Sequence, residues 1–147
     1  MEYVSEAERV AEALDIGPGT RVFEVDCGDG EFLFPLYSNG YIVGGIDGDP
    51  AAIEQALRAM PEGLFTVGMG ASLDPAVPWD VVICRSLSGA PHVDYMRGLV
   101  ARMFAKATHA IALLNVPEKS HLALMHSLAE VGAKAIQIDR NNLFARV

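Results

Sequence analysis

Short apolar segments alternate with amphipathic segments along almost the whole chain, and this alternation restricts the possible folds more than any other feature. Strands are predicted at 21–25, 42–46, 64–67, 80–84, 110–116, 134–139 and 143–147, and helices at 4–14, 31–38, 50–60, 93–106 and 120–132. Strands that alternate with helices form parallel βαβ units, so we expect a doubly wound α/β sheet. The turn 140–142 predicts a terminal hairpin that adds one antiparallel strand.

Local signals mark several helix boundaries. Ser5 with Glu8 has the spacing of a capping box. Asp49 followed by Pro50 supplies an N-cap and a proline at the first helical position. Pro35 should kink its helix or delay its start. Ser120 is expected to cap the last helix.

Composition indicates one folded domain over residues 1–147. About half of the residues are apolar, with no low-complexity run, no repeat and no linker. The longest apolar run, 110–114, is far shorter than the roughly 20 residues of a membrane span. The first residues lack the pattern of a signal peptide, so a cytoplasmic location is expected.

The charge balance argues against nucleic acid as a partner. The formal net charge is −8, and no basic stripe offsets it. Cys27 and Cys84 are too few for a disulfide framework or a zinc site. They lie at the ends of the first and fourth strands, which should be neighbours, so a redox or thiol role is one interpretation, and small buried apolar residues are the simpler one.

The segment VFEVDCGDGEF, at 22–32, passes from a strand through a glycine turn into a helix. In doubly wound sheets, ligands bind at such turns, at the carboxyl ends of the strands. The dinucleotide pattern Gly-x-Gly-x-x-Gly fails here, because Asp26 and Glu31 replace its first and third glycines. The turn also holds four carboxylates, at Glu24, Asp26, Asp29 and Glu31, which oppose a pyrophosphate and favour a positively charged ligand. A nicotinamide-dependent oxidoreductase is therefore disfavoured.

Four segments together resemble the class I S-adenosylmethionine-dependent methyltransferases: EVDCGDG (24–30), GYIVGGIDGDPAAIEQA (40–56), PWDVVICRSLSG (78–89) and LAEVGAKAIQI (128–138). The resemblance covers nearly the whole chain and implies a Rossmann-like, mostly parallel seven-stranded sheet with an antiparallel C-terminal hairpin. It implies S-adenosylmethionine as cofactor, with Glu24 as the acid of the first motif and Gly28 and Gly30 as its later glycines. Asp47 would then bind the ribose hydroxyls, since a carboxylate can accept two hydrogen bonds.

The chain departs from the family pattern at three places. Asp26 replaces the first glycine, Gly48 stands where an apolar side chain often packs on adenine, and Met69, followed by Gly70, stands where an acid often holds the adenine amino group. No Asn-Pro-Pro-Tyr or Asp-Pro-Pro-Tyr follows the fourth strand, so methylation of amino groups on DNA bases is not implied. The segments that usually build a substrate lid are nearly absent.

Asp26 has two interpretations. Aspartate tolerates the left-handed backbone that glycine would supply, and its carboxylate could face the ammonium group of S-adenosylmethionine. Alternatively it caps the turn or the next helix. Arg85 and Ser86 follow the fourth strand and either face the ligand or stabilise the loop.

His92 could remove a proton from the substrate, or it could be a surface or capping histidine. The pair His92 and Asp94 also begins an iron facial triad, but that triad belongs to another fold, and the other histidines lack ligand spacing, so no metal is predicted. The expected reaction is methyl transfer to a small-molecule nucleophile. The alternative is a non-catalytic binding or partner subunit. With so little lid, a second copy or a partner chain could complete the pocket.

Overall fold

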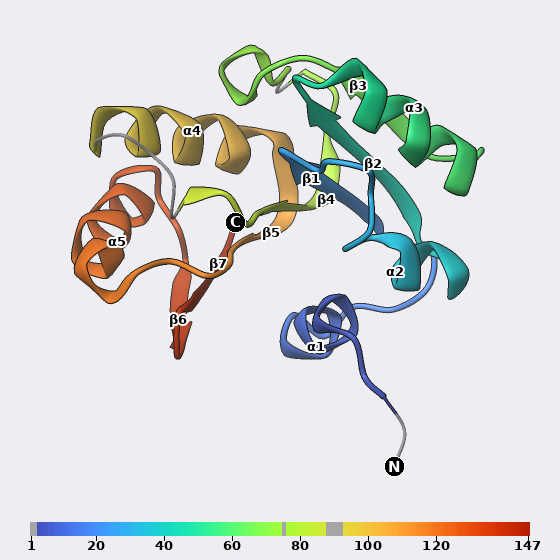
Figure 1. Cartoon of the computed structure of the whole chain (residues 1–147). Coiled ribbons are helices and arrows are strands. Elements are labelled where there is room, and N and C mark those ends of the chain that lie inside the picture. Colours follow the sequence, from blue (N-terminus) through green and yellow to red (C-terminus); the bar gives the residue numbers. More distant parts are fainter. Residues whose placement is uncertain (1–2, 75, 88–92) are drawn as a thin grey trace.

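The computed structural model describes residues 3–74, 76–87 and 93–147. Its centre is a seven-stranded sheet in the order β3-β2-β1-β4-β5-β7-β6 (Figure 1). The strands are β1 (Arg21–Val25), β2 (Ile42–Asp47), β3 (Leu64–Val67), β4 (Trp79–Cys84), β5 (Ala107–Leu113), β6 (Ala135–Asp139) and β7 (Asn142–Arg146). The first five strands pair in parallel, and β7 is antiparallel to both of its neighbours.

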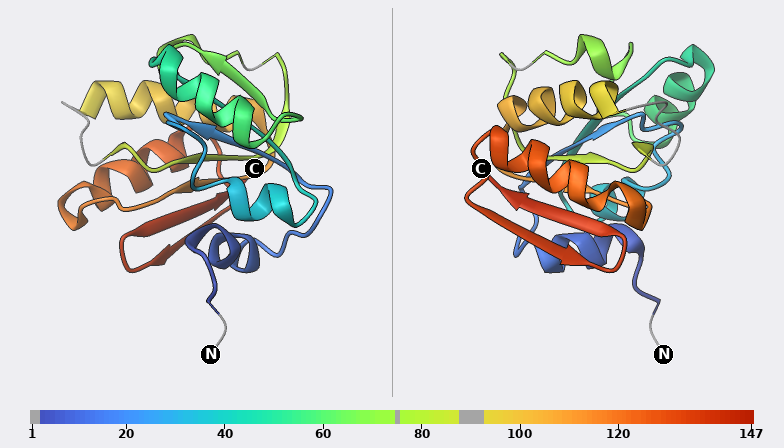
Figure 2. Two further views of the ribbon diagram at one scale, coloured as in Figure 1. Left: turned by 45° about the vertical axis from the view of Figure 1, so that its right-hand side comes forward. Right: turned by 90° about the vertical axis from the view of Figure 1, so that its left-hand side faces the viewer.

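Helices cover both faces of the sheet (Figures 1 and 2). The helices are α1 (Glu6–Ala13), α2 (Phe34–Ser38), α3 (Pro50–Ala59), α4 (Val93–Lys106) and α5 (His121–Glu130), with short 3-10 turns at η1 (Gly70–Ser72) and η3 (Glu118–Ser120). Buried residues of α1, α2 and α3 belong to one apolar cluster, and those of α4 and α5 belong to another. Because side chains alternate between the faces of a strand, the sheet separates these two cores.

The predicted fold class, a mostly parallel seven-stranded sheet with a C-terminal antiparallel pair, is confirmed. The expected capping box forms, since Ser5 Oγ accepts from the backbone N–H of Glu8 and the Glu8 carboxylate accepts from the backbone N–H of Ser5. Asp49 caps α3 by accepting from the backbone N–H of Ala51. Ser120 lies at the N-cap of α5, but its side chain makes no capping hydrogen bond because its backbone is already helical there.

Two elements differ from their predicted ranges by three residues at a boundary, while the other ends agree within two residues. Helix α2 begins at Phe34 instead of Glu31, as expected if Pro35 delays its start. Just before the helix, the backbone N–H groups of Leu33 and Phe34 both donate to the carbonyl of Gly30. Strand β5 is Ala107–Leu113, so the predicted range 110–116 was too late at both ends. Asn115 has a φ of 57°, a left-handed conformation that ends the extended chain.

Strand β1 lies between β2 and β4, and its last residue, Val25, is in register with Ile46 on one side and Cys84 on the other. The chain winds from β1 outwards to β3 and then returns to β4, so the winding reverses at this point. The carboxyl ends of β1, β2 and β4 therefore meet where doubly wound sheets bind ligands.

None of the helices in the described parts of the chain has both the length and the apolar character needed to cross a bilayer.

Candidate functional site

Three residues of the turn after β1 have a left-handed backbone. Asp26 has a φ of 57°, Gly28 of 57° and Gly30 of 81°. Asp26 thus adopts the left-handed conformation that the sequence led us to expect. A Cβ atom on Gly28 would meet nothing within 4 Å, whereas one on Gly30 would lie 2.3 Å from Cε of Met60. Gly28 leaves open space above the turn, and Gly30 lets the turn pack closely against α3.

Asp47, at the end of β2, is oriented by two backbone amides. The N–H of Gly28 donates to one carboxylate oxygen at 2.9 Å, and the N–H of Asp49 donates to the other at 2.9 Å. Each oxygen retains a lone pair for a further donor. The glycine turn and Asp47 therefore form one unit, with the carboxylate held at the carboxyl edge of the sheet.

Glu24 in β1 is fully buried, with a relative exposure of 0%. Its Oε2 atom accepts a hydrogen bond of 2.7 Å from Nε of Arg85, while Oε1 is buried without a partner in the described part of the chain. Burial raises the pKa of Glu24 to about 7, and the positive charge of Arg85 opposes part of that rise. An unpartnered buried carboxylate oxygen is costly, and a ligand that donates a hydrogen bond would satisfy it.

Ser86 and Asp26 connect the loop after β4 to the turn after β1. The hydroxyl of Ser86 donates to the carboxylate of Asp26 at 2.6 Å, and the same hydroxyl lies 3.3 Å from the thiol of Cys84. Asp26 therefore bonds neither its own turn nor the next helix in this structure. Instead, its carboxylate joins two of the strands that meet at this edge.

Gly48 and Met69 lie beside Asp47 at the ends of β2 and β3, where the N–H of Gly68 bonds the carbonyl of Asp47. A Cβ atom on Gly48 would lie 2.9 Å from Sδ of Met69. The absence of a side chain at Gly48 therefore allows Met69 to pack closely against the backbone there. A Cβ atom on Gly70 would instead face Leu99 and Val25. The Met69 side chain is 59% exposed. Thus Gly48 stands where the family pattern has an apolar residue, and the flexible apolar side chain of Met69 stands where that pattern has an acid.

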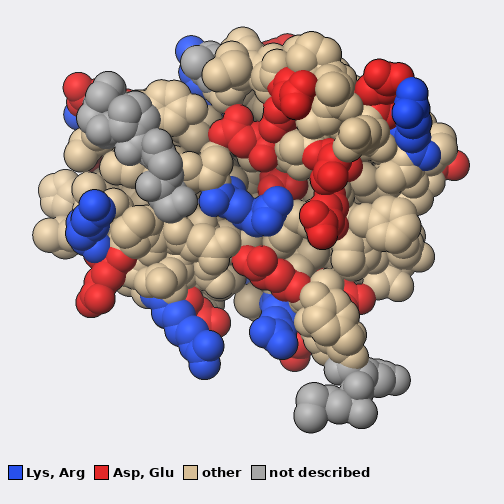
Figure 3. All heavy atoms as spheres, in the orientation of Figure 1, with Lys and Arg blue, Asp and Glu red and all other residues tan. Residues whose placement is uncertain are grey.

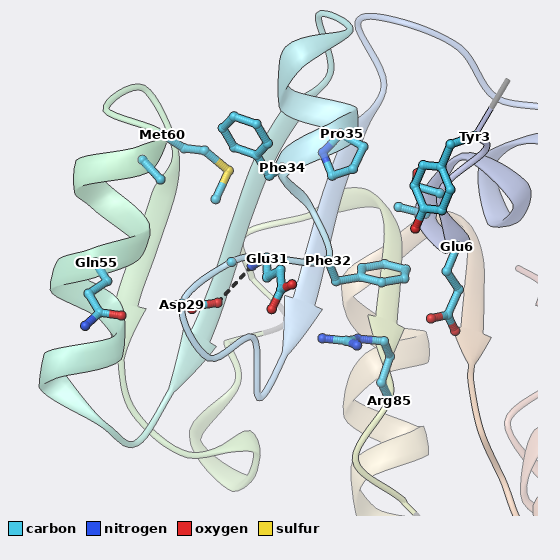
Figure 4. A pocket seen from close by; sticks show the side chains of 14 residues that line it. Tyr3, Glu6, Asp29, Glu31, Phe32, Phe34, Pro35, Gln55, Met60 and Arg85 are labelled. Atoms are coloured by element: carbon cyan, nitrogen blue, oxygen red, sulfur yellow. Dashed lines mark hydrogen bonds between the residues drawn. The ribbon is translucent and has the colours of Figure 1, made fainter.

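A cavity of about 710 Å³ opens between α1, the turn after β1 and α3 (Figure 4). Of the predicted site residues, Gly30 and Arg85 line it. The guanidinium group of Arg85 lies 4.5 Å from the ring centroid of Phe32. Glu6, on α1, also lines the cavity. Neither Phe32 nor Glu6 was predicted, because their place in the cavity depends on how distant elements pack.

The two cysteines are buried and make no disulfide. Burial raises the pKa of Cys27 to about 12 and that of Cys84 above its usual range, so both thiols stay protonated at neutral pH. This supports the interpretation of Cys27 and Cys84 as small core residues. His92 lies outside the described residues.

No protein-family profile matches the chain, and no curated protein matches it in sequence. Solved structures do match. A TehB-like S-adenosylmethionine-dependent methyltransferase from Corynebacterium glutamicum is 15% identical with a TM-score of 0.78, over 99% of this chain and 87% of that one. The sugar N-methyltransferase KedS8 from Streptoalloteichus is 16% identical with a TM-score of 0.79, over 99% and 87% of the two chains.

Magnesium protoporphyrin IX methyltransferase from Synechocystis, solved with bound S-adenosylmethionine, is 17% identical with a TM-score of 0.76, over 99% of this chain and 86% of that one. The chain therefore has the Rossmann-like fold of the S-adenosylmethionine-dependent methyltransferases, and the resemblance seen in its sequence is confirmed at the level of the fold.

Proposed function

We propose that the chain binds S-adenosylmethionine and transfers its methyl group to a small-molecule nucleophile. The hydrogen bond from the Gly28 N–H to the Asp47 carboxylate carries the proposal. It joins the glycine turn to an acid at the end of the next strand, at the reversal of the winding, in a fold shared with methyltransferases.

The donors and acceptors of the site suit this cofactor. The remaining lone pairs of Asp47 would accept from the two ribose hydroxyls, and Met69 with Gly48 would offer an apolar surface to adenine. The carboxylates of Asp26 and Glu24 would attract the ammonium group, and Oε1 of Glu24 has no donor among the described residues. Bound S-adenosylmethionine supplies an electrophilic methyl group on a sulfonium.

The remaining task of the protein is to bring the acceptor into line with that methyl group. The substrate would enter beside Arg85 and Ser86, at the end of β4. His92, in the segment that follows, is a candidate for proton removal. KedS8 and the Synechocystis protein, which share the fold, are named as a sugar N-methyltransferase and a magnesium protoporphyrin IX methyltransferase, and this favours a small-molecule acceptor. A second copy or a partner chain could complete the pocket.

Calorimetric titration with S-adenosylmethionine, S-adenosylhomocysteine and NADH tests the cofactor. We expect binding of the first two and no binding of NADH. Failure of S-adenosylhomocysteine to bind would refute the proposal. Release of S-adenosylhomocysteine from S-adenosylmethionine in the presence of candidate acceptors then tests transfer, and binding without turnover against a broad panel would favour a non-catalytic subunit.

A further inference from the structure

We propose that the cavity lined by Glu6, Glu31, Phe32 and Arg85 recognises a positively charged group of the substrate, so that the substrate is a small organic cation such as an alkylammonium compound. The inference names the substrate class and rests on the proposed function for its role in methyl transfer. The preference of the cavity for cations is a separate property that can be measured without a cofactor.

The charges on the cavity wall are unbalanced. Three carboxylates line it, those of Glu6, Asp29 and Glu31, against one basic side chain, that of Arg85. Arg85 is already paired with the buried carboxylate of Glu24 at 2.7 Å. Among the described residues, no ion pair neutralises Glu6, Asp29 or Glu31. Figure 3 shows acidic side chains gathered around a central basic group on this face of the molecule.

Glu24, behind the wall, is the carboxylate that occupies the positive charge of Arg85. Its carboxylate is fully buried, its Oε1 atom has no partner in the described residues, and it bonds the same Arg85 that lines the cavity. Burial is the largest cause of the raised pKa of Glu24, and Arg85 lowers that pKa. The negative charges of Asp26 and, to a smaller extent, Glu6 raise it further. The region around the cavity is therefore short of positive charge, which a cationic ligand would provide.

Aromatic rings complete a surface that suits an organic cation. The guanidinium group of Arg85 already lies over the ring of Phe32, so a cation and a ring meet on this wall (Figure 4). Two further rings line the cavity and are unusually open, with Phe34 46% and Tyr3 89% exposed. Aromatic faces attract alkylammonium groups, and neighbouring carboxylates strengthen that attraction.

The cavity adjoins the proposed cofactor site without coinciding with it. Its volume of about 710 Å³ lies in the range of small-molecule pockets. Its described lining includes Gly30 and Arg85 from the cofactor turn and the β4 end, but not Asp47, Gly48 or Met69. A ligand here would lie beside the turn rather than over the ribose and adenine positions.

The test compares choline with 3,3-dimethylbutan-1-ol, which replaces the charged nitrogen by carbon at nearly constant shape. Dissociation constants are measured by NMR titration, with and without saturating S-adenosylhomocysteine. We expect choline to bind about 10-fold more tightly than the alcohol, and this preference to shrink at high salt. Glu31→Gln and Glu6→Gln should each weaken choline binding about 3-fold or more.

The matched control is Glu118→Gln, the same substitution at an exposed site in η3, which should leave choline binding unchanged. Equal affinity for choline and the alcohol, or the same effect at Glu31 and Glu118, would overturn the proposal. Displacement of choline by S-adenosylhomocysteine would also overturn it, because the cation would then occupy the cofactor's own site. If S-adenosylhomocysteine does not bind at all, the proposed function fails, and the comparison of choline with the alcohol still decides the cation preference.

Discussion

Arg85 and Glu24 form an ion pair that joins the carboxyl ends of β4 and β1, with Nε of Arg85 2.7 Å from Oε2 of Glu24. The pair is asymmetric, because the Arg85 side chain is 33% exposed while Glu24 is fully buried. Arg85 can therefore remain hydrated without its partner, whereas Glu24 cannot. Removing the charge of Glu24 should be better tolerated than removing that of Arg85.

The buried carboxylate makes stability depend on pH. Burial raises the pKa of Glu24 from its ordinary value of 4.5 to about 7. Between these values the folded chain holds a proton that the unfolded chain releases, so this contribution to stability is complete below pH 4.5 and is lost as the pH rises through about 7. Glu24→Gln removes this loss. Between pH 5 and pH 8, the free energy of unfolding of the variant should gain roughly 2 kcal/mol relative to wild type.

Urea denaturation of both proteins at the two pH values measures the effect. Glu118→Gln, at an exposed site, serves as the control and should follow wild type. Parallel pH profiles for wild type and Glu24→Gln would show that Glu24 is already ionised at pH 5.

Asp47 is expected to be essential for cofactor affinity. Asp47→Ala removes both the proposed ribose acceptors and the acceptor of the Gly28 N–H, so the affinity for S-adenosylhomocysteine should fall by about 1.5–3 kcal/mol. Asp47→Asn keeps one carbonyl oxygen and should lose less. Calorimetry provides the dissociation constants, with Asp139→Ala on the distant strand β6 as the control. Unchanged affinity in a folded Asp47→Ala variant would refute the ribose assignment.

Gly30 is expected to contribute to the stability of the fold. Gly30→Ala would place a Cβ atom 2.3 Å from Cε of the buried Met60, at a φ of 81° that alanine rarely adopts. We expect a loss of about 2 kcal/mol in the free energy of unfolding. The control is Gly17→Ala, where the new Cβ atom meets nothing within 4 Å, and its effect should stay within about 0.5 kcal/mol. Thermal denaturation of the two variants makes the comparison, and equal melting temperatures would contradict it.

The sequence was most informative where local chemistry decides the structure. Asp49 and Pro50 start α3 as predicted, and Arg21–Val25 is a strand with the predicted bounds. The terminal hairpin was predicted too, but not that β7 would lie between β5 and β6, because the turn specifies the pairing of its own two strands and not their place in the sheet.

The cavity and the ion pair could not be predicted in the same way. Glu24 and Arg85 were each candidates, yet they are 61 positions apart, and only the parallel pairing of β1 with β4 brings them together. Phe32 was taken simply as the end of the glycine segment. Its contact with Arg85 and its place in the cavity depend on the packing of α1, α2 and α3, which no local pattern encodes.

Asp26 provides the test of how this turn differs from the family pattern. Its backbone is left-handed, its carboxylate accepts from Ser86 at 2.6 Å, and it stands where the family has glycine. Three variants separate its roles. Asp26→Asn removes the charge and keeps an acceptor for Ser86, Ser86→Ala removes only the hydrogen bond, and Asp26→Gly removes both while suiting the left-handed backbone.

If the Asp26 carboxylate pairs with the cofactor's ammonium group, Asp26→Asn and Asp26→Gly should both weaken S-adenosylhomocysteine binding by about 1 kcal/mol, the scale for a partly exposed ion pair, and Ser86→Ala should weaken it less. If the side chain instead obstructs the turn, Asp26→Gly should tighten binding while Asp26→Asn leaves it unchanged. We expect the first pattern, because the turn already holds glycine at positions 28 and 30 and its other acidic neighbours point to a cationic ligand. Tighter binding by Asp26→Gly would mean that this aspartate is a defect in the cofactor turn, and the non-catalytic alternative would gain support.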